Sequence, residues 1–321
     1  MNMNLMNAVL CACGFTAAAS IVSAGPLQRA DVPAETAWIL HVDVDRLRPT
    51  AVGQYLVAEM DKPEAQANFA AFQSMLNFDP RKQLHGLTLY GTGASPETGV
   101  LLVYGDFDPD RLASMVQGAH DYQSTPHGKH VIHNWIDDKK KPVNGVKPRV
   151  YGAVQGTHIV VLAQQEKRVA DALDALDHTT RSLADGNLFP QLGAGGNTSI
   201  IQAAARKLDI PDSAPQAAVL RLAKGAVLQV GEAEGGQAKA TLNLEASDAE
   251  VAQLMASVGH GLVALLKLQR DNPGSQKLAE GLSVRQDGAH VIVTLAMPTG
   301  GVVDLMKADA ARKAKKQAEK E

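Results

Sequence analysis

One pattern in the sequence constrains the fold more than any other, because it occurs twice. Residues 156–176 are GTHIVVLAQQEKRVADALDAL, and residues 288–307 are GAHVIVTLAMPTGGVVDLMK. Each copy has a turn glycine, a β-branched run, a break and an amphipathic helix, with a histidine (His158 or His290) at its third position. The repetition predicts that one architecture has been used twice, with both histidines in structural positions beside a hairpin.

The elements predicted around the two copies also follow one order. In the first half they cover 38–44, 50–60, 84–105, 108–119 and 149–176, and in the second half 198–208, 226–246, 247–268 and 282–307. The shared order of strands, hairpins and helices implies an α+β fold. We expect two related domains, each an antiparallel or mixed sheet with helices packed on one face. The two sheets could lie side by side or merge into one.

A segment rich in Gly, Thr and Ser at 177–197 separates the two halves. We therefore expect a first domain over 25–190, a second domain over 191–306 and a charged tail over 307–321. The hydrophobic content of 45% is sufficient for two cores. No Phe, Tyr or Trp follows Phe189, so the second domain is the plainer repeat, and a specific site is expected in the first.

The N-terminal 24 residues predict export. They contain no charged side chain and end in small or compact residues (Val22, Ser23 and Ala24), which predicts a signal peptide cleaved before Gly25. Both cysteines of the chain lie inside it, so the mature chain is cysteine-free and thiolate chemistry is excluded. We expect a periplasmic or secreted protein. The alternatives are an uncleaved segment that contacts the membrane as an anchor, or a lipidated Cys13.

The charge of the chain excludes one class of partner. The formal net charge is −3, and the tail 307–321 carries an excess of Lys and Arg, so the body before it is more acidic than the total indicates. Because nucleic-acid binding depends on neutralising phosphates with basic side chains, nucleic acid is not expected as a partner.

The densest cluster of ionisable side chains contains His127, His130 and His133, followed by Asp137. Imidazole and carboxylate groups together suit zinc, copper or nickel. Steps of three residues place His130 and His133 on opposite faces of a strand, so only a bend in the chain would bring them together. The alternatives are a divalent-metal site and a set of exposed histidines on an edge strand.

A second candidate site lies on the predicted strands of the first half. In residues 38–44, WILHVDV, apolar and polar side chains alternate. If His41, Asp43, Thr88, Tyr90 and Tyr151 share the face away from the helices, they form a polar surface with two aromatic hydroxyls that could bind a ligand. The alternative is an ordinary solvent-facing sheet surface.

A hydrolase is the third hypothesis. His41, Asp43, Asp106 and Asp108 have side chains suited to acid–base chemistry. However, Asp108 is explained as a helix N-cap, and the sequence contains no G-x-S-x-G motif, H-E-x-x-H motif or phosphate-binding glycine loop. The residues therefore favour a protein without catalytic activity.

Several segments together carry a resemblance to known proteins. WILHVDVDRL, GQYL, LHGLTLYG, LVYGDFD and HNWIDD resemble an uncharacterised family of exported bacterial proteins with signal peptides. The resemblance covers most of the first half and, more loosely, the second. It implies export and a duplicated α+β fold, and it supplies no catalytic residue. We therefore expect an exported, non-enzymatic binding or interaction module for a protein or small ligand of the cell envelope.

Overall fold

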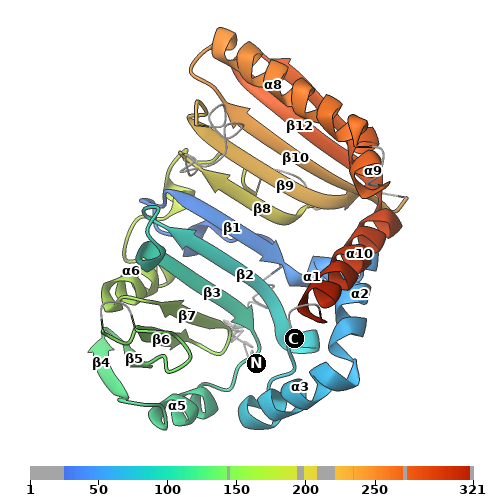
Figure 1. Cartoon of the computed structure of the whole chain (residues 1–321). Coiled ribbons are helices and arrows are strands. Elements are labelled where there is room, and N and C mark those ends of the chain that lie inside the picture. The colour runs from blue at the N-terminus through green and yellow to red at the C-terminus, as the bar shows by residue number, and fades with distance from the viewer. Residues whose placement is uncertain are drawn as a thin grey trace, which may run out of the picture.

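The computed structural model describes residues 25–142, 145–193, 199–207, 221–233, 235–269 and 273–318; the predicted signal peptide lies outside these residues. In this part of the chain, twelve strands form one sheet, in the order β11-β12-β10-β9-β8-β1-β2-β3-β7-β6-β5-β4 (Figure 1). All neighbouring strands are antiparallel. The protein is therefore α+β, as the sequence predicts.

The strands of the first half have five to eight residues and those of the second half six to nine. Their bounds are β1 Trp38–Asp43, β2 Leu84–Gly91, β3 Gly99–Gly105, β4 Gln123–His127, β5 His130–Ile136, β6 Arg149–Gln155, β7 Ile159–Ala163, β8 Ser199–Ala205, β9 Gly225–Ala233, β10 Gln237–Glu245, β11 Leu282–Asp287 and β12 His290–Pro298.

The helices connect or follow the hairpins. Their bounds are α1 Val44–Leu47, α2 Ala51–Met60, α3 Pro63–Leu76, α4 Pro80–Gln83, α5 Pro109–Gln117, α6 Glu166–Leu176, α8 Ala249–Leu268, α9 Pro273–Gly281 and α10 Thr299–Ala318, with 3-10 turns η1 Arg29–Asp31, η2 Pro96–Thr98 and η3 Leu183–Asp185. Figure 1 shows α2, α3 and α10 grouped beyond one end of the strands.

The two expected sheets are one continuous sheet. The first strand of the second half, β8, pairs along its length with the first strand of the first half, β1. On either side of this pair the strands follow the same order: β1-β2-β3-β7-β6 in one direction and β8-β9-β10-β12-β11 in the other. The hairpin β4–β5 extends only the first half.

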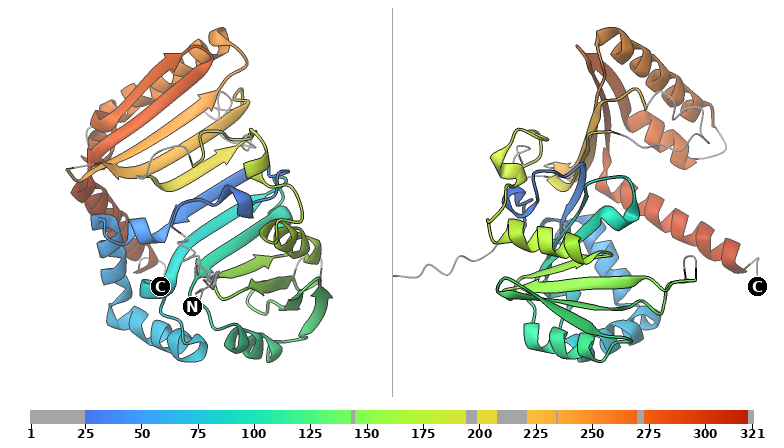
Figure 2. Two further views of the ribbon diagram at one scale, coloured as in Figure 1. Left: turned by 180° about the vertical axis from the view of Figure 1, so that it is seen from behind. Right: turned by 90° about the vertical axis from the view of Figure 1, so that its left-hand side faces the viewer.

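The covering helices lie on opposite faces of this sheet. In the first half, α6 packs through Val169 and Leu173 on the face that carries Ile39 and Leu102. In the second half, α8 packs through Met255 on the other face, and Figure 2 shows α6 and α8 on opposite sides. Each half is covered on one face as predicted. In chain order, α6 follows the last hairpin of its half, whereas α8 precedes the last hairpin of its own.

Two local predictions were wrong. The sequence HGKHVIHNWI predicts a single strand over His127–Ile136. Instead, Gly128, with φ of +57°, turns the chain between β4 and β5, and glycine adopts this conformation without strain. Ser247, followed by Glu250 in S-x-x-E spacing, predicts a cap at Ser247. The cap is Asp248 instead, whose carboxylate accepts from the Val251 N–H at 2.8 Å. The prediction that Asp108 caps α5 is confirmed, since its carboxylate accepts from the Arg111 N–H at 3.0 Å.

Candidate functional site

The polar residues predicted as a wet surface lie on the covered face of the first half. His41, Asp43 and Tyr90 are each 2% exposed or less, and Tyr151 is half-buried against the same core. The four share a face, as the sequence predicts, but that face is not open to solvent. The sequence pattern predicts that these polar groups are exposed to solvent. This prediction failed because α6 and residues 25–36 pack over them.

His41 is held as a neutral imidazole within this buried layer. Its Nε2 lies 3.1 Å from the Gly25 carbonyl, and its Nδ1 lies 2.9 Å from the Thr88 hydroxyl. Because a carbonyl only accepts, Nε2 carries the proton and Nδ1 accepts from Thr88. Burial lowers the pKa of His41 and outweighs the opposing effects of the Gly25 carbonyl and Asp43. His41 therefore ties the start of the described chain to β2.

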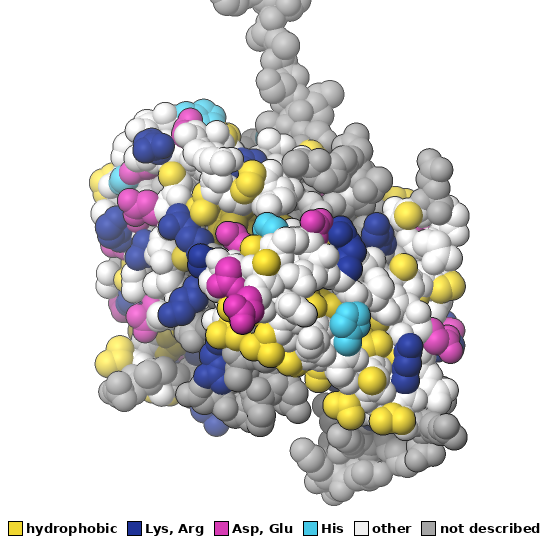
Figure 3. Space-filling view, turned by 90° about the horizontal axis from the view of Figure 1, so that it is seen from above, with side chains coloured by type: hydrophobic (Ala, Val, Ile, Leu, Met, Phe, Trp, Pro, Cys, Tyr) yellow, Lys and Arg dark blue, Asp and Glu magenta, His cyan; other side chains and the backbone are white. Residues whose placement is uncertain are grey.

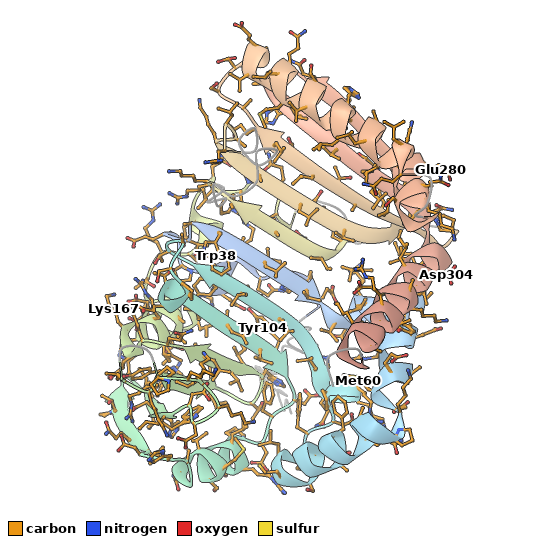
Figure 4. All side chains as sticks on the ribbon, in the orientation of Figure 1. Trp38, Met60, Tyr104, Lys167, Glu280 and Asp304 are labelled. Atoms are coloured by element: carbon orange, nitrogen blue, oxygen red, sulfur yellow. The ribbon has the colours of Figure 1, made fainter. Side chains whose placement is uncertain are left out.

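A cavity of about 460 Å³ opens at the end of this layer, where α6 begins. We call it the Tyr90 cavity. Its lining comes from the segment after η1, from β2 and β3, from α6 and from residues after α6: Pro33, Ala34, Glu35, Tyr90, Thr92, Thr98, Val100, Lys167, Arg168, Asp171, Thr180 and Arg181. Figure 4 shows Lys167 at the rim of the molecule beside α6.

Long-range contacts fix the two loop segments that wall the cavity. Pro33 and Ser182 form an antiparallel bridge, and the Ala34 N–H donates to the Arg181 carbonyl at 3.0 Å. The Arg29 guanidinium donates to the carbonyls of Phe189 at 2.7 Å and Leu183 at 2.8 Å. The walls are therefore held by the fold rather than left as free loops.

Two buried donors in the lining have no partner among the described residues: the Tyr90 hydroxyl and Arg168 Nε. Burial is the largest cause that raises the pKa of Tyr90, so its hydroxyl keeps its proton. A buried donor without an acceptor costs about 1–3 kcal/mol. Both groups can donate to an oxygen atom, and both belong to residues that line one cavity.

Basic side chains outnumber acidic ones around the cavity. Lys167 Nζ lies 2.6 Å from Asp171, and Arg168 Nη1 lies 3.6 Å from the same carboxylate. Within the described part of the chain, Arg181 makes no ion pair within 4.0 Å. The first turn of α6 lies here too, and its cap residue Gln165 gives no side-chain hydrogen bond. Unpaired N–H groups and the helix dipole also favour an anion at this end.

The predicted metal ligands do not converge. His127 Nε2 lies 2.8 Å from Asp174, and His130 Nε2 lies 2.9 Å from Asp177, so both join the hairpin to α6. On the opposite face of β5, His133 lies 2.8 Å from the Tyr122 hydroxyl.

Asp137 instead accepts from the Lys139 N–H at 3.1 Å. Among the residues that the structure describes, no group of three or more His, Cys, Asp or Glu side chains is arranged to hold a metal ion.

The predicted acid–base residues are separated as well. Asp108 caps α5, and Asp106 lies 3.2 Å from His85 Nε2. The Nδ1 atom of His85 lies 3.0 Å from Asp45. Burial opposes the charged form of His85, but the two carboxylates together raise its pKa. Sequence reasoning missed this cluster, because His85 and Asp45 lie 40 residues apart and only the β1–β2 pairing brings them together.

The other face of the first half is apolar, and no element among the described residues covers it. We call it the open face; each of its apolar side chains remains at least partly exposed: Trp38, Leu40, Val42, Leu87, Leu89, Leu101, Val103, Val131, Trp135, Val150, Val154, Val160 and Leu162. Leu40 and Leu89 are each 36% exposed. Both tryptophans of the chain are on this face. A continuous exposed apolar surface of this kind marks an interaction site.

Helix α8 has an exposed apolar surface of its own. Its outer stripe consists of side chains spaced along one side of the helix: Leu254, Leu262, Leu265 and Leu268. Of the helices in the described part of the chain, α8 has the length and composition needed to cross a membrane. Core helices of soluble proteins meet the same criterion.

Comparisons with known proteins show no named family. No family model matches the chain, and no curated protein matches it. Among solved structures, crystal form I of TP0453 from Treponema has a similar outline, with a TM-score of 0.47 and 12% sequence identity over 89% of this chain and 98% of that chain. These comparisons assign the chain to no family.

Proposed function

We propose that this protein is an exported, non-enzymatic binding protein whose ligand is a small acidic molecule held in the Tyr90 cavity. One observation carries the proposal: two buried donors, the Tyr90 hydroxyl and Arg168 Nε, lack partners in a cavity surrounded by basic side chains. An oxygen-bearing anion would satisfy both donors at once. Its binding would remove a cost that the empty cavity carries.

The lining defines the chemical class of the ligand. Arginine side chains bind carboxylate and phosphate groups through paired N–H donors, and Arg168 and Arg181 both line the cavity. Pro33, Ala34 and Val100 supply a short apolar wall. The volume of about 460 Å³ lies in the range of sites for small ligands. A compact carboxylate or phosphate compound with a small apolar part fits this lining.

Calorimetric titration of the purified, exported protein with citrate and with inorganic phosphate tests the proposal. Tyr90→Phe removes only the hydroxyl, and Arg181→Gln removes the guanidinium group together with its charge. Each substitution is expected to weaken anion binding about tenfold, the effect of losing one hydrogen bond to a charged group. Arg285→Gln makes the same change on the distant strand β11, where Arg285 lies 3.2 Å from Asp287, and should leave binding unchanged.

The stability of the ligand-free protein gives a second test, in which Tyr90→Phe is not expected to be harmful. Because the Tyr90 hydroxyl has no partner in the part of the chain that the structure describes, Tyr90→Phe should leave the stability of the ligand-free protein equal or higher while it weakens binding. A large loss of stability would show that the hydroxyl is already satisfied, and the proposal would fail. Anion binding that is insensitive to both cavity substitutions would reject it too.

Export and duplication belong to the same proposal. N-terminal sequencing of exported material should find Gly25 first, and a start elsewhere would reject the cleavage site. The matching strand orders on the two sides of the β1–β8 pair support descent of both halves from one duplicated unit. If the two sets of five strands superposed no better than unrelated antiparallel sheets, the duplication would be rejected.

A further inference from the structure

Two apolar surfaces of this protein lack a covering element among the described residues. One is the open face of the first half, and the other is the outer stripe of α8. In the outer stripe, Leu254 is 54% exposed, Leu265 is 56% exposed and Leu268 is 71% exposed. Seen from above, hydrophobic side chains lie uncovered in a broken band across the surface (Figure 3). Each surface groups several exposed apolar side chains together, whereas ordinary protein surfaces expose such side chains singly.

The two surfaces lie on the same side of the sheet. Cross-strand pairing connects the open face to the residues beneath α8 through one row of neighbours: Leu89, Leu40, Ala203, Leu228, Leu242 and Val293. The last two pack against the core under α8. Figure 1 accordingly shows α8 in front of the upper strands, while the lower strands beside it are bare on the same side.

The pattern of each surface indicates what should cover it. A helix that is apolar on most of its circumference is packed on more than one side, and α8 already uses one side on its own sheet. A sheet with two apolar faces is normally covered on both. Among the described residues, no second sheet covers the outer stripe of α8 and no helix covers the open face.

We propose that a second copy of this chain supplies both missing partners. In this arrangement the two copies face one another across a two-fold axis parallel to the sheets. The outer stripe of α8 from each copy lies on the open face of the other, so both helices form one layer between two sheets. The contact is reciprocal, as two-fold symmetry requires, and it does not depend on the Tyr90 cavity.

The height of α8 above the sheet favours this occupant over a flat one. A packed helix stands about 10 Å in front of its sheet. A flat lipid surface that touches the outer stripe would therefore remain about 10 Å from the open face. A second copy has the same step in its own surface, so it can contact both apolar surfaces together.

The expected area is sufficient for a stable dimer. α8 has 20 residues, which gives a helix about 30 Å long and about 10 Å across. Each helix-on-sheet contact then covers on the order of 300 Å² on both surfaces. Two such contacts bury about 1,200 Å² in total, the lower end of the range for specific interfaces.

Sedimentation equilibrium of the purified, exported protein tests the inference. The wild-type protein should have twice the chain mass at micromolar concentration. Leu265→Glu on the outer stripe and Leu89→Glu on the open face each place a charge in both contacts, and each should weaken the dimer at least about 100-fold. Gln253→Glu, at an exposed polar position of the same helix, and Thr241→Glu, on the opposite face of the second half, should change it less than about threefold.

Mixing the two leucine variants provides a sharper test. A mixed dimer of Leu265→Glu with Leu89→Glu keeps one contact free of both charges, so it should form at least about tenfold more tightly than either variant alone. Thermal unfolding establishes that each variant is folded. A wild-type monomer at 100 μM would overturn the inference, as would a dimer that survives both substitutions. A folded monomer that binds vesicles through Leu265 would assign the stripe to lipid and overturn it as well.

Discussion

The two halves of this sheet have opposite arrangements of polar and apolar side chains. In the second half, the face away from α8 carries polar side chains such as Gln229, Thr241 and Thr294, as in an ordinary antiparallel sheet with one wet face. In the first half, the covered face contains His41, Asp43 and Thr88, whereas the uncovered face is apolar. Polarity alone therefore does not identify the exposed side of a strand.

The two halves also differ in how completely their cores are buried. The first half buries a larger and more continuous core, in which Leu102, Val161 and Leu173 have no exposed surface. Many strand residues under α8 remain half-exposed, Leu242 and Val293 among them. We therefore expect the first half to provide most of the stability, and the second half to be the weaker part of the single sheet.

Leucine truncation in the two cores tests this difference with the largest expected effect. Leu102→Ala leaves a cavity in the first core and should lower the free energy of unfolding by about 3 kcal/mol. Leu242→Ala acts at a partly buried position and should lower it by about 1 kcal/mol. Urea unfolding followed by circular dichroism measures both. Equal losses would show that the two cores are packed alike.

Most of the architecture could be predicted from periodicity, whereas the choice of covered face could not. Alternation in residues 38–44 places Leu40 and His41 on opposite sides, and it does so correctly. Which side becomes buried depends on where α6 and residues 25–36 pack, and that is a tertiary property. The glycine at 128 was a visible signal for the turn between β4 and β5, but the β-branched residues after it favoured one longer strand.

A matched pair of threonines tests the buried polar layer, with an intermediate effect. Thr88→Val keeps the shape of the side chain but leaves His41 Nδ1 without its donor, so stability should fall by about 2 kcal/mol. Thr241→Val, on the polar face of the second half, should change stability by less than about 0.5 kcal/mol. The same urea experiment applies. A small effect at Thr88 would show that His41 finds another donor and that the layer is not specifically arranged.

The candidate sites were only partly visible in the sequence, for a related reason. Tyr90 was selected for its hydroxyl and does line the cavity. Lys167 and Arg168 on α6, and Arg181 after it, line the cavity as well, but the sequence analysis named none of them as a candidate. His127, His130 and His133 form the densest cluster of histidines in the sequence. In the structure, however, His127 is paired with Asp174 and His130 with Asp177. Histidines that are close together in the sequence therefore do not converge on one site in the structure.

The prediction with the smallest expected effect concerns pH. The residue that pairs with His41 on β8 is Gln202. Since glutamine does not titrate, only the first half has an ionisable side chain at this position. The pKa of His41 is lowered by burial, so at pH values above about 6.5, the ordinary pKa of histidine, its stabilising contacts are fully present. Below that value the unfolded chain takes up a proton that the folded protein resists. Stability then falls by at most about 1.4 kcal/mol per pH unit until the folded pKa is reached.

His41→Gln, which copies the second half, should remove this loss between pH 6.5 and 5. Burial lowers the pKa of His133 as well, but His133 is present in both proteins and cancels from their difference. His85 acts in another range, because its raised pKa means that its contribution is complete below about pH 6.5 and is lost as the pH rises through the folded value. Urea midpoints at half-unit pH steps measure the difference. Parallel pH profiles for the two proteins would show that His41 titrates as freely in the folded protein as in the unfolded chain, and that its burial beneath residues 25–36 does not control its charge.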